Sequence, residues 1–184
     1  MRVAFIGWGS LVWNPGDLLV QGEWFQDGPL LPIEFCRHSN NGRLTLVISP
    51  GKPELRALWA LSSAATLAEA VESLQKREGM TVPQQIKDNN TGVWPADPKH
   101  ASVRESVSKW GVAKCLDAVV WTALEPRCHK EKRCPTAEEA VSIIRDLPHE
   151  KKRIAEEYVR RTPIQIDTDF RRRFEQEFGW RPIA

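Results

Sequence analysis

A short glycine-containing segment near the start of the chain has the residue types of an anion-binding loop. Two glycines allow positive φ, so that the N–H groups of Gly9, Ser10 and Leu11 could converge on a carboxylate or a phosphate. The hydroxyl of Ser10 could add a donor. The alternative is a strand-ending turn that packs Trp8 and Trp13 and binds nothing. The full segment is Ala4-Phe5-Ile6-Gly7-Trp8-Gly9-Ser10-Leu11.

The same segment is a poor match to a dinucleotide-binding fingerprint. A strand that ends in Gly-x-Gly begins such a fingerprint, but the third glycine is missing here. Residues 11–15 are not expected to open a helix, and the strands that follow are expected to form hairpins. We therefore expect no dinucleotide at this loop.

Glu78 could be a surface glutamate or, if it is partly buried, a group that transfers protons. It follows Lys76 and Arg77 at the end of a predicted helix. A carboxyl group partly buried in a pocket there could take up a proton and return it during a reaction near neutral pH. The plain alternative is an exposed glutamate that closes a surface helix beside basic residues.

The cysteines and histidines do not have the spacing of a metal site. Cys128-His129 and Cys134 lack a second pair at ligand spacing, so we expect a solvated loop with incidental thiols instead of zinc. Cys36 and His38 alternate onto one face of a predicted strand, which leaves a Cys–His pair as a minor alternative. Cys115 is expected to be buried.

Two basic runs, Lys151–Arg153 and Arg171–Arg173, raise the alternative of a nucleic-acid surface. Acidic residues are interleaved with both runs, which is typical of a solvated, salt-bridged surface, so we expect no nucleic-acid partner. Phe170, Phe174 and Phe178 are spaced four apart. This stripe is expected to dock a helix onto the core or, as the alternative, to form a partner or dimer interface.

The residue pattern predicts strands in the first third of the chain and one late strand. Asn40-Asn41-Gly42 and Pro50–Pro53 are turn sequences, so the strands around them are expected to form an antiparallel meander. The late strand is apolar almost throughout, which favours a central position. The predicted strands are Arg2–Ile6, Pro32–His38, Arg43–Ser49, Leu55–Leu61 and Cys115–Leu124.

Helices are predicted between and after these strands. The first is expected to be capped by Ser62 or Ser63 and to stop at Gly79. Thr136 and Glu139 form a capping box for a later helix. Residues 81–99 are expected to be an irregular loop. The other helices are predicted over 101–110, from 136 to before Pro148, from 148 to 161, and over a last segment ending at Gly179.

The composition is that of a globular protein of the α+β class. The 184 residues are 41% hydrophobic and 27% charged, with a formal net charge of +2, which gives no reason to expect nucleic acid or anionic lipid as a partner. No apolar run reaches the roughly 18 residues that a membrane helix needs, and the N-terminal sequence does not resemble a signal peptide. Four cysteines do not make a disulfide framework at this length, so we expect a cytoplasmic protein. We expect one domain over residues 1–184, with helices from about residue 135.

Three motifs in the first 80 residues resemble those of gamma-glutamylcyclotransferase-like proteins, most closely the ChaC branch. Phe5–Trp13 is similar to the family's signature loop, with Trp8 where the family usually has tyrosine. Phe35–Ser39 followed by Gly42–Val47 continues the resemblance. Ser73–Gly79 is similar to the segment that carries the family's catalytic glutamate. Three motifs in the right order are more specific than any one of them.

The resemblance implies a small, mixed, mainly antiparallel β-barrel flanked by helices. It implies that the loop Gly7-Trp8-Gly9-Ser10-Leu11 binds substrate, its last three amides holding the α-carboxylate of a γ-glutamyl group, and that Glu78 acts first as general base and then as general acid. The implied reaction cyclises a γ-glutamyl amine, amino acid or peptide to 5-oxoproline and needs no metal or cofactor. The implied partner is this small substrate, with no nucleic acid and no membrane, and the chain is expected to be a monomer or a homodimer.

The chain departs from the family pattern after residue 80. Met80 stands where family members often turn through glycine to an aromatic residue, and Tyr158 is the only tyrosine in the chain. The identity of the leaving amine is therefore open, with glutathione as one candidate beside simpler γ-glutamyl amines. Two other functions also stay open: a γ-glutamyl amine transferase with the same fold, and a binding or regulatory protein that kept the pocket and lost turnover.

Overall fold

The computed structural model describes residues 1–39, 42–79, 91–95 and 101–183. The chain divides into two compact units that are built from alternating segments. The first unit comprises Met1–Gly7, Leu11–Leu31 and Arg56–Leu124. The second unit comprises Trp8–Ser10, Pro32–Leu55 and Glu125–Ala184.

The first unit contains a five-stranded sheet. Its strands are β1 (Val3–Gly7), β2 (Val20–Phe25), β6 (Leu58–Ser62), β7 (Thr91–Trp94) and β8 (Ala118–Thr122). They lie in the order β2-β6-β1-β8-β7. β1 is antiparallel to β6 and parallel to β8, so that Phe5 lies opposite Ala60 on one side and Val120 on the other. β7 is antiparallel to β8, and β2 is antiparallel to β6.

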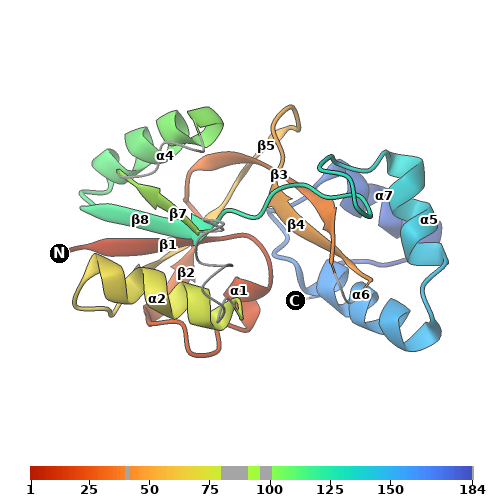
Figure 1. Ribbon diagram of the computed structural model, residues 1–184, viewed down its shortest axis with the longest axis horizontal. Helices are drawn as coiled ribbons and strands as arrows, with labels where there is room; N and C mark the ends of the chain where they lie inside the picture. Colours follow the sequence, from red (N-terminus) through yellow and green to blue (C-terminus); the bar gives the residue numbers. More distant parts are fainter. Residues whose placement is uncertain (40–41, 80–90, 96–100, 184) are drawn as a thin grey trace. The chain divides into compact units, whose positions relative to one another are not determined.

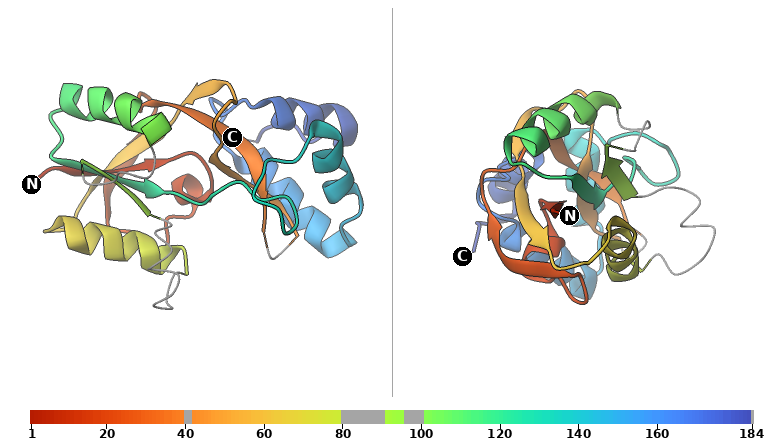
Figure 2. Two further views of the ribbon diagram at one scale, coloured as in Figure 1. Left: turned by 45° about the horizontal axis from the view of Figure 1, so that its top comes forward. Right: turned by 90° about the vertical axis from the view of Figure 1, so that its left-hand side faces the viewer.

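Helices cover both faces of this sheet, which explains why its central strands are apolar throughout. Ala70 and Leu74 of α2 (Leu67–Arg77) pack with Phe5 in one buried cluster. α4 (Ala101–Ala113) lies on the opposite side of the strands (Figures 1 and 2). Within the predicted strand Cys115–Leu124, residues Ala118–Thr122 form β8. β8 has a neighbouring strand on each side, so its predicted central position is confirmed.

The two ends of α2 are set by local capping. The hydroxyl of Thr66 accepts a hydrogen bond from the N–H of Glu69 at 3.2 Å, so the N-cap is Thr66 and the prediction of Ser62 or Ser63 is wrong. Ser62 instead ends strand β6, and the chain needs a few extended residues before the helix can begin. The predicted stop at Gly79 is confirmed by its φ of +69°.

The second unit contains most of a three-stranded sheet. Its strands are β3 (Leu30–His38), β4 (Leu44–Ile48) and β5 (Glu54–Arg56), in the order β4-β3-β5. β3 and β4 form the predicted antiparallel pair, with His38 opposite Leu44. Asn40 and Asn41 of the predicted turn lie outside the described residues. β5 lies beside β3 and not beside β4, so the strands do not continue as the expected meander.

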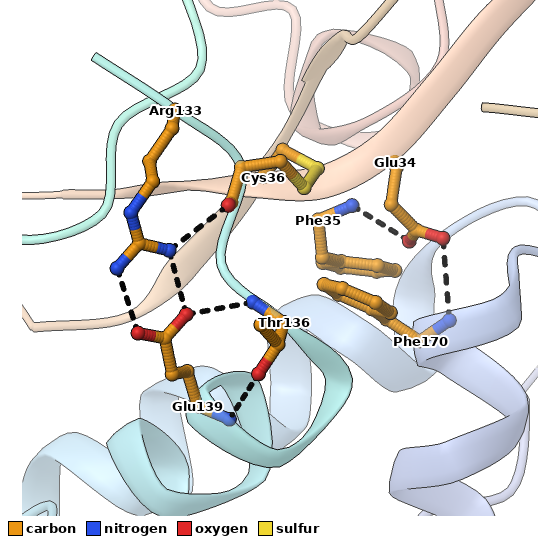
Figure 3. The surroundings of a disulfide bond; sticks show 8 residues. Glu34, Phe35, Cys36, Arg133, Thr136, Glu139 and Phe170 are labelled. Atoms are coloured by element: carbon orange, nitrogen blue, oxygen red, sulfur yellow. Dashed lines mark hydrogen bonds and ion pairs between the residues drawn. A yellow bond between two sulfur atoms is a disulfide. The ribbon is translucent and has the colours of Figure 1, made fainter. Parts of the chain in front are cut away.

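Three helices of the second unit pack together. They are α5 (Ala137–Arg145), α6 (His149–Arg161) and α7 (Asp169–Phe178), and α5 lies beside both of the others (Figure 1). The predicted capping box of α5 is present: the Thr136 hydroxyl accepts from the N–H of Glu139, and the Glu139 carboxylate accepts from the N–H of Thr136 (Figure 3). The predicted boundaries of α6 at Pro148 and Thr162 are also confirmed.

Aromatic rings fix α7 to the core of this unit. The ring of Phe174 lies 5.7 Å from that of Phe35 on β3, in an edge-to-face arrangement. Phe170 is also buried, and Phe178 is half-buried. The phenylalanine stripe therefore docks the helix onto the core, as predicted.

A carboxyl group is buried at the N-terminus of α7. Glu34 on β3 is 1% exposed, and its carboxylate accepts the N–H of Phe35 at 2.8 Å and that of Phe170 at 3.3 Å (Figure 3). Burial raises the pKa of Glu34, although these hydrogen bonds and the hydroxyl of Thr168 act in the opposite direction.

The described chain is α+β with two mostly antiparallel sheets, which confirms the predicted class. Neither sheet closes into the expected barrel within the described residues, because one ends at β2 and β7 and the other at β4 and β5. β2 was not among the predicted strands. Gly22 in this strand has a φ of +77° and interrupts the alternation of its side chains.

Two further segments differ from the predictions. The predicted strand Leu55–Leu61 is broken at Ala57, which ends the three-stranded sheet at β5 and begins the pairing of β6 in the other sheet. β7 lies inside the segment expected to be an irregular loop, where its residues pair with β8. The rest of that segment, 81–90 and 96–99, lies outside the described residues.

Candidate functional site

The glycines of the predicted anion-binding loop are needed for close approach and not for positive φ. Neither Gly7 nor Gly9 has a positive φ, contrary to the expectation. In the first unit, a β-carbon at Gly7 would lie 2.7 Å from the ring of Trp24. A side chain at this position would therefore displace the indole of Trp24.

The side chain of Trp8 is buried within the second unit. It is 5% exposed, and its indole N–H donates to the carbonyl oxygen of Leu46 on β4 at 3.2 Å. Because the indole is engaged in this way, a contribution of Trp8 to ligand binding would come from its backbone.

Gly9 lies against the only tyrosine of the chain. A β-carbon at Gly9 would lie 2.7 Å from the hydroxyl oxygen of Tyr158 on α6. The same oxygen accepts the N–H of Leu46 at 3.3 Å. Sequence reasoning did not place Tyr158 at the loop, because nothing in the local pattern of α6 indicates a neighbour so distant along the chain.

Ser10 begins a helical turn of four residues, α1 (Ser10–Trp13). The prediction that residues 11–15 open no helix is therefore wrong for this one turn. Ser10 is half-buried at its start, and the next residue, Leu11, is buried in the core of the first unit.

Glu78 is the C-cap residue of α2. Its N–H donates to the carbonyl of Leu74 at 3.0 Å, which fixes its backbone to the last turn of the helix. Its carboxylate oxygen Oε1 accepts a hydrogen bond from the guanidinium of Arg77 at 2.7 Å. The side chain is 17% exposed, so Glu78 is not the freely solvated residue of the plain alternative.

The end of α2 is fixed to the segment that follows α1, within the first unit. The guanidinium of Arg77 donates to the carbonyl of Asn14 at 2.8 Å, and Lys76 forms an ion pair with Asp17 at 3.5 Å. The Arg77 guanidinium therefore holds the carboxylate of Glu78 and the backbone just beyond the glycine loop at the same time.

The predicted site residues fall in both units. Those in the first unit are Gly7, Leu11 and Glu78, and those in the second are Trp8, Gly9 and Ser10.

The cysteines differ from the predictions. Cys36 on β3 forms a disulfide with Cys134, so Cys134 is not an incidental thiol (Figure 3). Cys128 is buried, and its burial raises the pKa of the thiol. Cys115 is exposed, because it lies in the tight turn after α4 with a φ of +53°, and not in the predicted strand.

His38 and His129 face one another in the second unit. Their ring centroids are 5.0 Å apart, and they line a cavity of about 330 Å³ with residues of α5. Burial and the neighbouring His129 and Arg127 lower the pKa of His38. Across the described ranges no group of three or more His, Cys, Asp or Glu side chains could hold a metal ion.

The basic run in α7 contains one buried residue. Arg171 is 3% exposed, and its guanidinium donates to backbone carbonyls, among them that of Thr162 at 2.5 Å. Arg172 and Arg173 are exposed and form ion pairs with acidic neighbours, as expected for a salt-bridged surface. Arg171 is the exception, because its side chain satisfies the carbonyls at the end of α6.

Comparison with known proteins returned no significant similarity: no family model, no curated protein and no solved structure matches the chain. Within the part of the chain that is described, no helix has both the length and the apolar character needed to span a bilayer.

Proposed function

We propose that this chain cyclises a γ-glutamyl amine, amino acid or peptide to 5-oxoproline. The proposal starts from the three motifs that resemble the gamma-glutamylcyclotransferase-like family. The observation that carries it further is the setting of Glu78, a largely buried carboxyl group that one guanidinium connects to the backbone beyond the glycine loop.

The contacts of Glu78 fix the position of its carboxyl group. The guanidinium of Arg77 donates a hydrogen bond to Oε1 of the carboxylate at 2.7 Å. The backbone is fixed by the helix end, so the carboxyl group has little freedom to move away. A positioned carboxyl group of this kind can contribute about 10²–10⁴-fold to a proton-transfer reaction.

The proposed reaction is an intramolecular aminolysis. The α-amine of the γ-glutamyl group attacks its own γ-carbonyl carbon, the new C–N bond closes the five-membered ring, and the C–N bond to the leaving amine breaks. The attacking nitrogen begins as an ammonium and loses two protons, which leave with the amine; Glu78 accepts and returns them. Because the nucleophile is tethered to the electrophile, proximity supplies much of the acceleration. The amides of Gly9, Ser10 and Leu11 hold the α-carboxylate.

The test is detection of 5-oxoproline by mass spectrometry after incubation of the purified protein with a panel of γ-glutamyl compounds. We expect product from the unmodified protein, and a loss of about 10²-fold or more in rate for Glu78→Gln, because the amide cannot relay a proton. Glu72→Gln is the matched control, since Glu72 is an exposed glutamate on the same helix. It should keep the full rate.

Two results would contradict the proposal. If no compound gives 5-oxoproline, the cyclisation reaction is ruled out. The binding or regulatory alternative would then take its place. Comparable rates for Glu78→Gln and Glu72→Gln would remove Glu78 as the proton-transfer group.

A further inference from the structure

The cavity of about 330 Å³ at His38 and His129 lies entirely within the second unit. His38 lines it from the end of β3, and His129 lines it from the loop of residues 125–136 that precedes α5. Residues of α5 and Leu147 just beyond it form the other side. The volume is in the range of sites that bind small molecules.

The walls of this cavity are joined to one another. A disulfide links β3 to the loop, and two backbone hydrogen bonds reinforce it. The N–H of His38 donates to the carbonyl of Arg127 at 2.7 Å, and the N–H of Arg127 donates to the carbonyl of Cys36 at 2.8 Å. The loop is joined to α5 by Arg133, whose guanidinium donates to both carboxylate oxygens of Glu139 at 2.7 Å (Figure 3). Walls fixed in this way lose little conformational freedom when a ligand binds.

The lining of the cavity is negatively charged. Asp146 is the C-cap residue of α5, and the unpaired carbonyls of a helix end add a partial negative charge there. Its carboxylate accepts the hydroxyl of Ser142 at 3.1 Å, and within the described part of the chain no basic side chain forms an ion pair with it. Glu139 is ionised as well, because the hydrogen bonds from Arg133 and from the backbone of Thr136 lower its pKa to about 2. These charges favour a cation and repel an anion.

The other lining groups select among cations. A metal ion does not fit, since the described residues bring together no group of three or more His, Cys, Asp or Glu side chains that could hold one. Two imidazoles this close are not both protonated near neutral pH, because like charges repel, and a neutral imidazole has one acceptor nitrogen. Ile143 and Leu147 add apolar surface. An ammonium group on a short hydrocarbon chain has both the N–H donors and the apolar part that this lining requires.

We infer that the cavity at His38 and His129 binds a primary alkylammonium ion. The carboxylate of Asp146 pairs with the ammonium group, the two imidazoles accept its remaining N–H groups, and the hydrocarbon chain lies against the apolar part of the lining. The inference goes beyond the proposed function and does not rest on it, because neither Glu78 nor the glycine loop takes part.

The experiment compares three ligands that have the same hydrocarbon chain and differ in charge: pentylammonium, pentanol and pentanoate. Binding to the full chain near neutral pH is followed by NMR of the histidine ring C–H groups and of the backbone amides of α5. The ring signals of His38 and His129 should shift with pentylammonium. Pentylammonium should bind at least about tenfold more tightly than pentanol, as expected for hydrogen bonds to a charged group, and pentanoate should not bind.

Variants test the assigned contacts. Asp146→Asn keeps the shape of the side chain and removes its charge, so it should weaken pentylammonium binding about tenfold and leave the affinity for pentanol within about twofold. Asparagine is well suited to the end of a helix, so this variant should fold, and thermal unfolding checks that it does. His129→Phe keeps an aromatic ring without an acceptor nitrogen and should also weaken pentylammonium more than pentanol. Glu138→Gln is the matched control, since Glu138 is exposed on the same helix and does not line the cavity.

The inference is overturned if pentylammonium and pentanol bind equally, if pentanoate binds more tightly than pentylammonium, or if none of the three shifts the histidine signals. It is also overturned if Asp146→Asn weakens pentylammonium binding no more than Glu138→Gln does. The readout is binding and not turnover. Failure of this inference therefore leaves the proposed reaction intact, and absence of 5-oxoproline leaves the cation site intact.

Discussion

The hydroxyl oxygen of Tyr158 lies so close to Gly9 that a methyl group on this glycine would be 2.7 Å from it. The tyrosine has little room to retreat, because the residue is 7% exposed and its hydroxyl oxygen accepts the N–H of Leu46. Glycine is therefore required at position 9 by a neighbouring side chain and not by its own backbone conformation.

Gly9→Ala should lower the free energy of unfolding by about 1–3 kcal/mol, the usual cost of forcing an extra methyl group into a packed site. Tyr158→Phe removes the oxygen that the methyl group would meet. The cost of Gly9→Ala should therefore be smaller in the Tyr158→Phe background. Urea unfolding of the four proteins in this cycle measures the coupling, and an equal cost in both backgrounds would contradict the steric explanation.

Trp8→Phe should lower the free energy of unfolding by about 1–3 kcal/mol, because the buried carbonyl of Leu46 loses the indole N–H that it accepts. If Trp8 contributes to the site through its backbone, the KM for a γ-glutamyl substrate should change by less than about threefold at a temperature where the variant is folded. Steady-state kinetics and urea unfolding of the same preparation check both parts. A large rise in KM without loss of stability would show that the indole itself contacts the substrate.

Glu34→Gln should reveal a pH-dependent contribution to stability. Burial raises the pKa of Glu34 above its ordinary value of 4.5, so the folded state holds this proton more tightly than the unfolded state. The contribution is fully present below about pH 4.5 and is lost as the pH rises through the folded pKa. The free energy of unfolding of the unmodified protein should therefore fall relative to that of Glu34→Gln as the pH rises. Urea unfolding at several pH values tests this, and a constant difference would contradict it.

Reduction of the Cys36–Cys134 disulfide should lower the free energy of unfolding by about 2–4 kcal/mol, because the bond closes a loop between residues 98 positions apart. Cys134→Ser should have the same effect without reductant and should then be insensitive to dithiothreitol. Cys115→Ser is the control, since that thiol is exposed and free. Identical urea unfolding curves with and without dithiothreitol would show that the disulfide does not form in solution.

Elements with strong local signals could be predicted from the sequence, and pairings between distant segments could not. The capping box at Thr136 and Glu139 and the stop at Gly79 are local rules, and both are present. The break at Ala57 sends β5 and β6 to different sheets, and this choice depends on partners that no local pattern identifies.

The same limit applies to the candidate site. The residue types of the loop at Gly9 and of the carboxyl group at Glu78 were recognisable, but the reason for the glycine was not, since it depends on Tyr158. The disulfide between Cys36 and Cys134 was also missed, because cysteine count and spacing do not reveal which distant thiols meet in the fold.

The alternation of segments between the two units has a practical consequence. The chain leaves the first unit after Gly7, returns at Leu11, leaves again after Leu31, returns at Arg56 and leaves for the last time after Leu124. No single cut in the polypeptide can therefore release either unit whole, and neither can be cloned as one uninterrupted fragment. A protease nick at any point between Trp8 and Leu124 would leave both units with pieces on each side of the break.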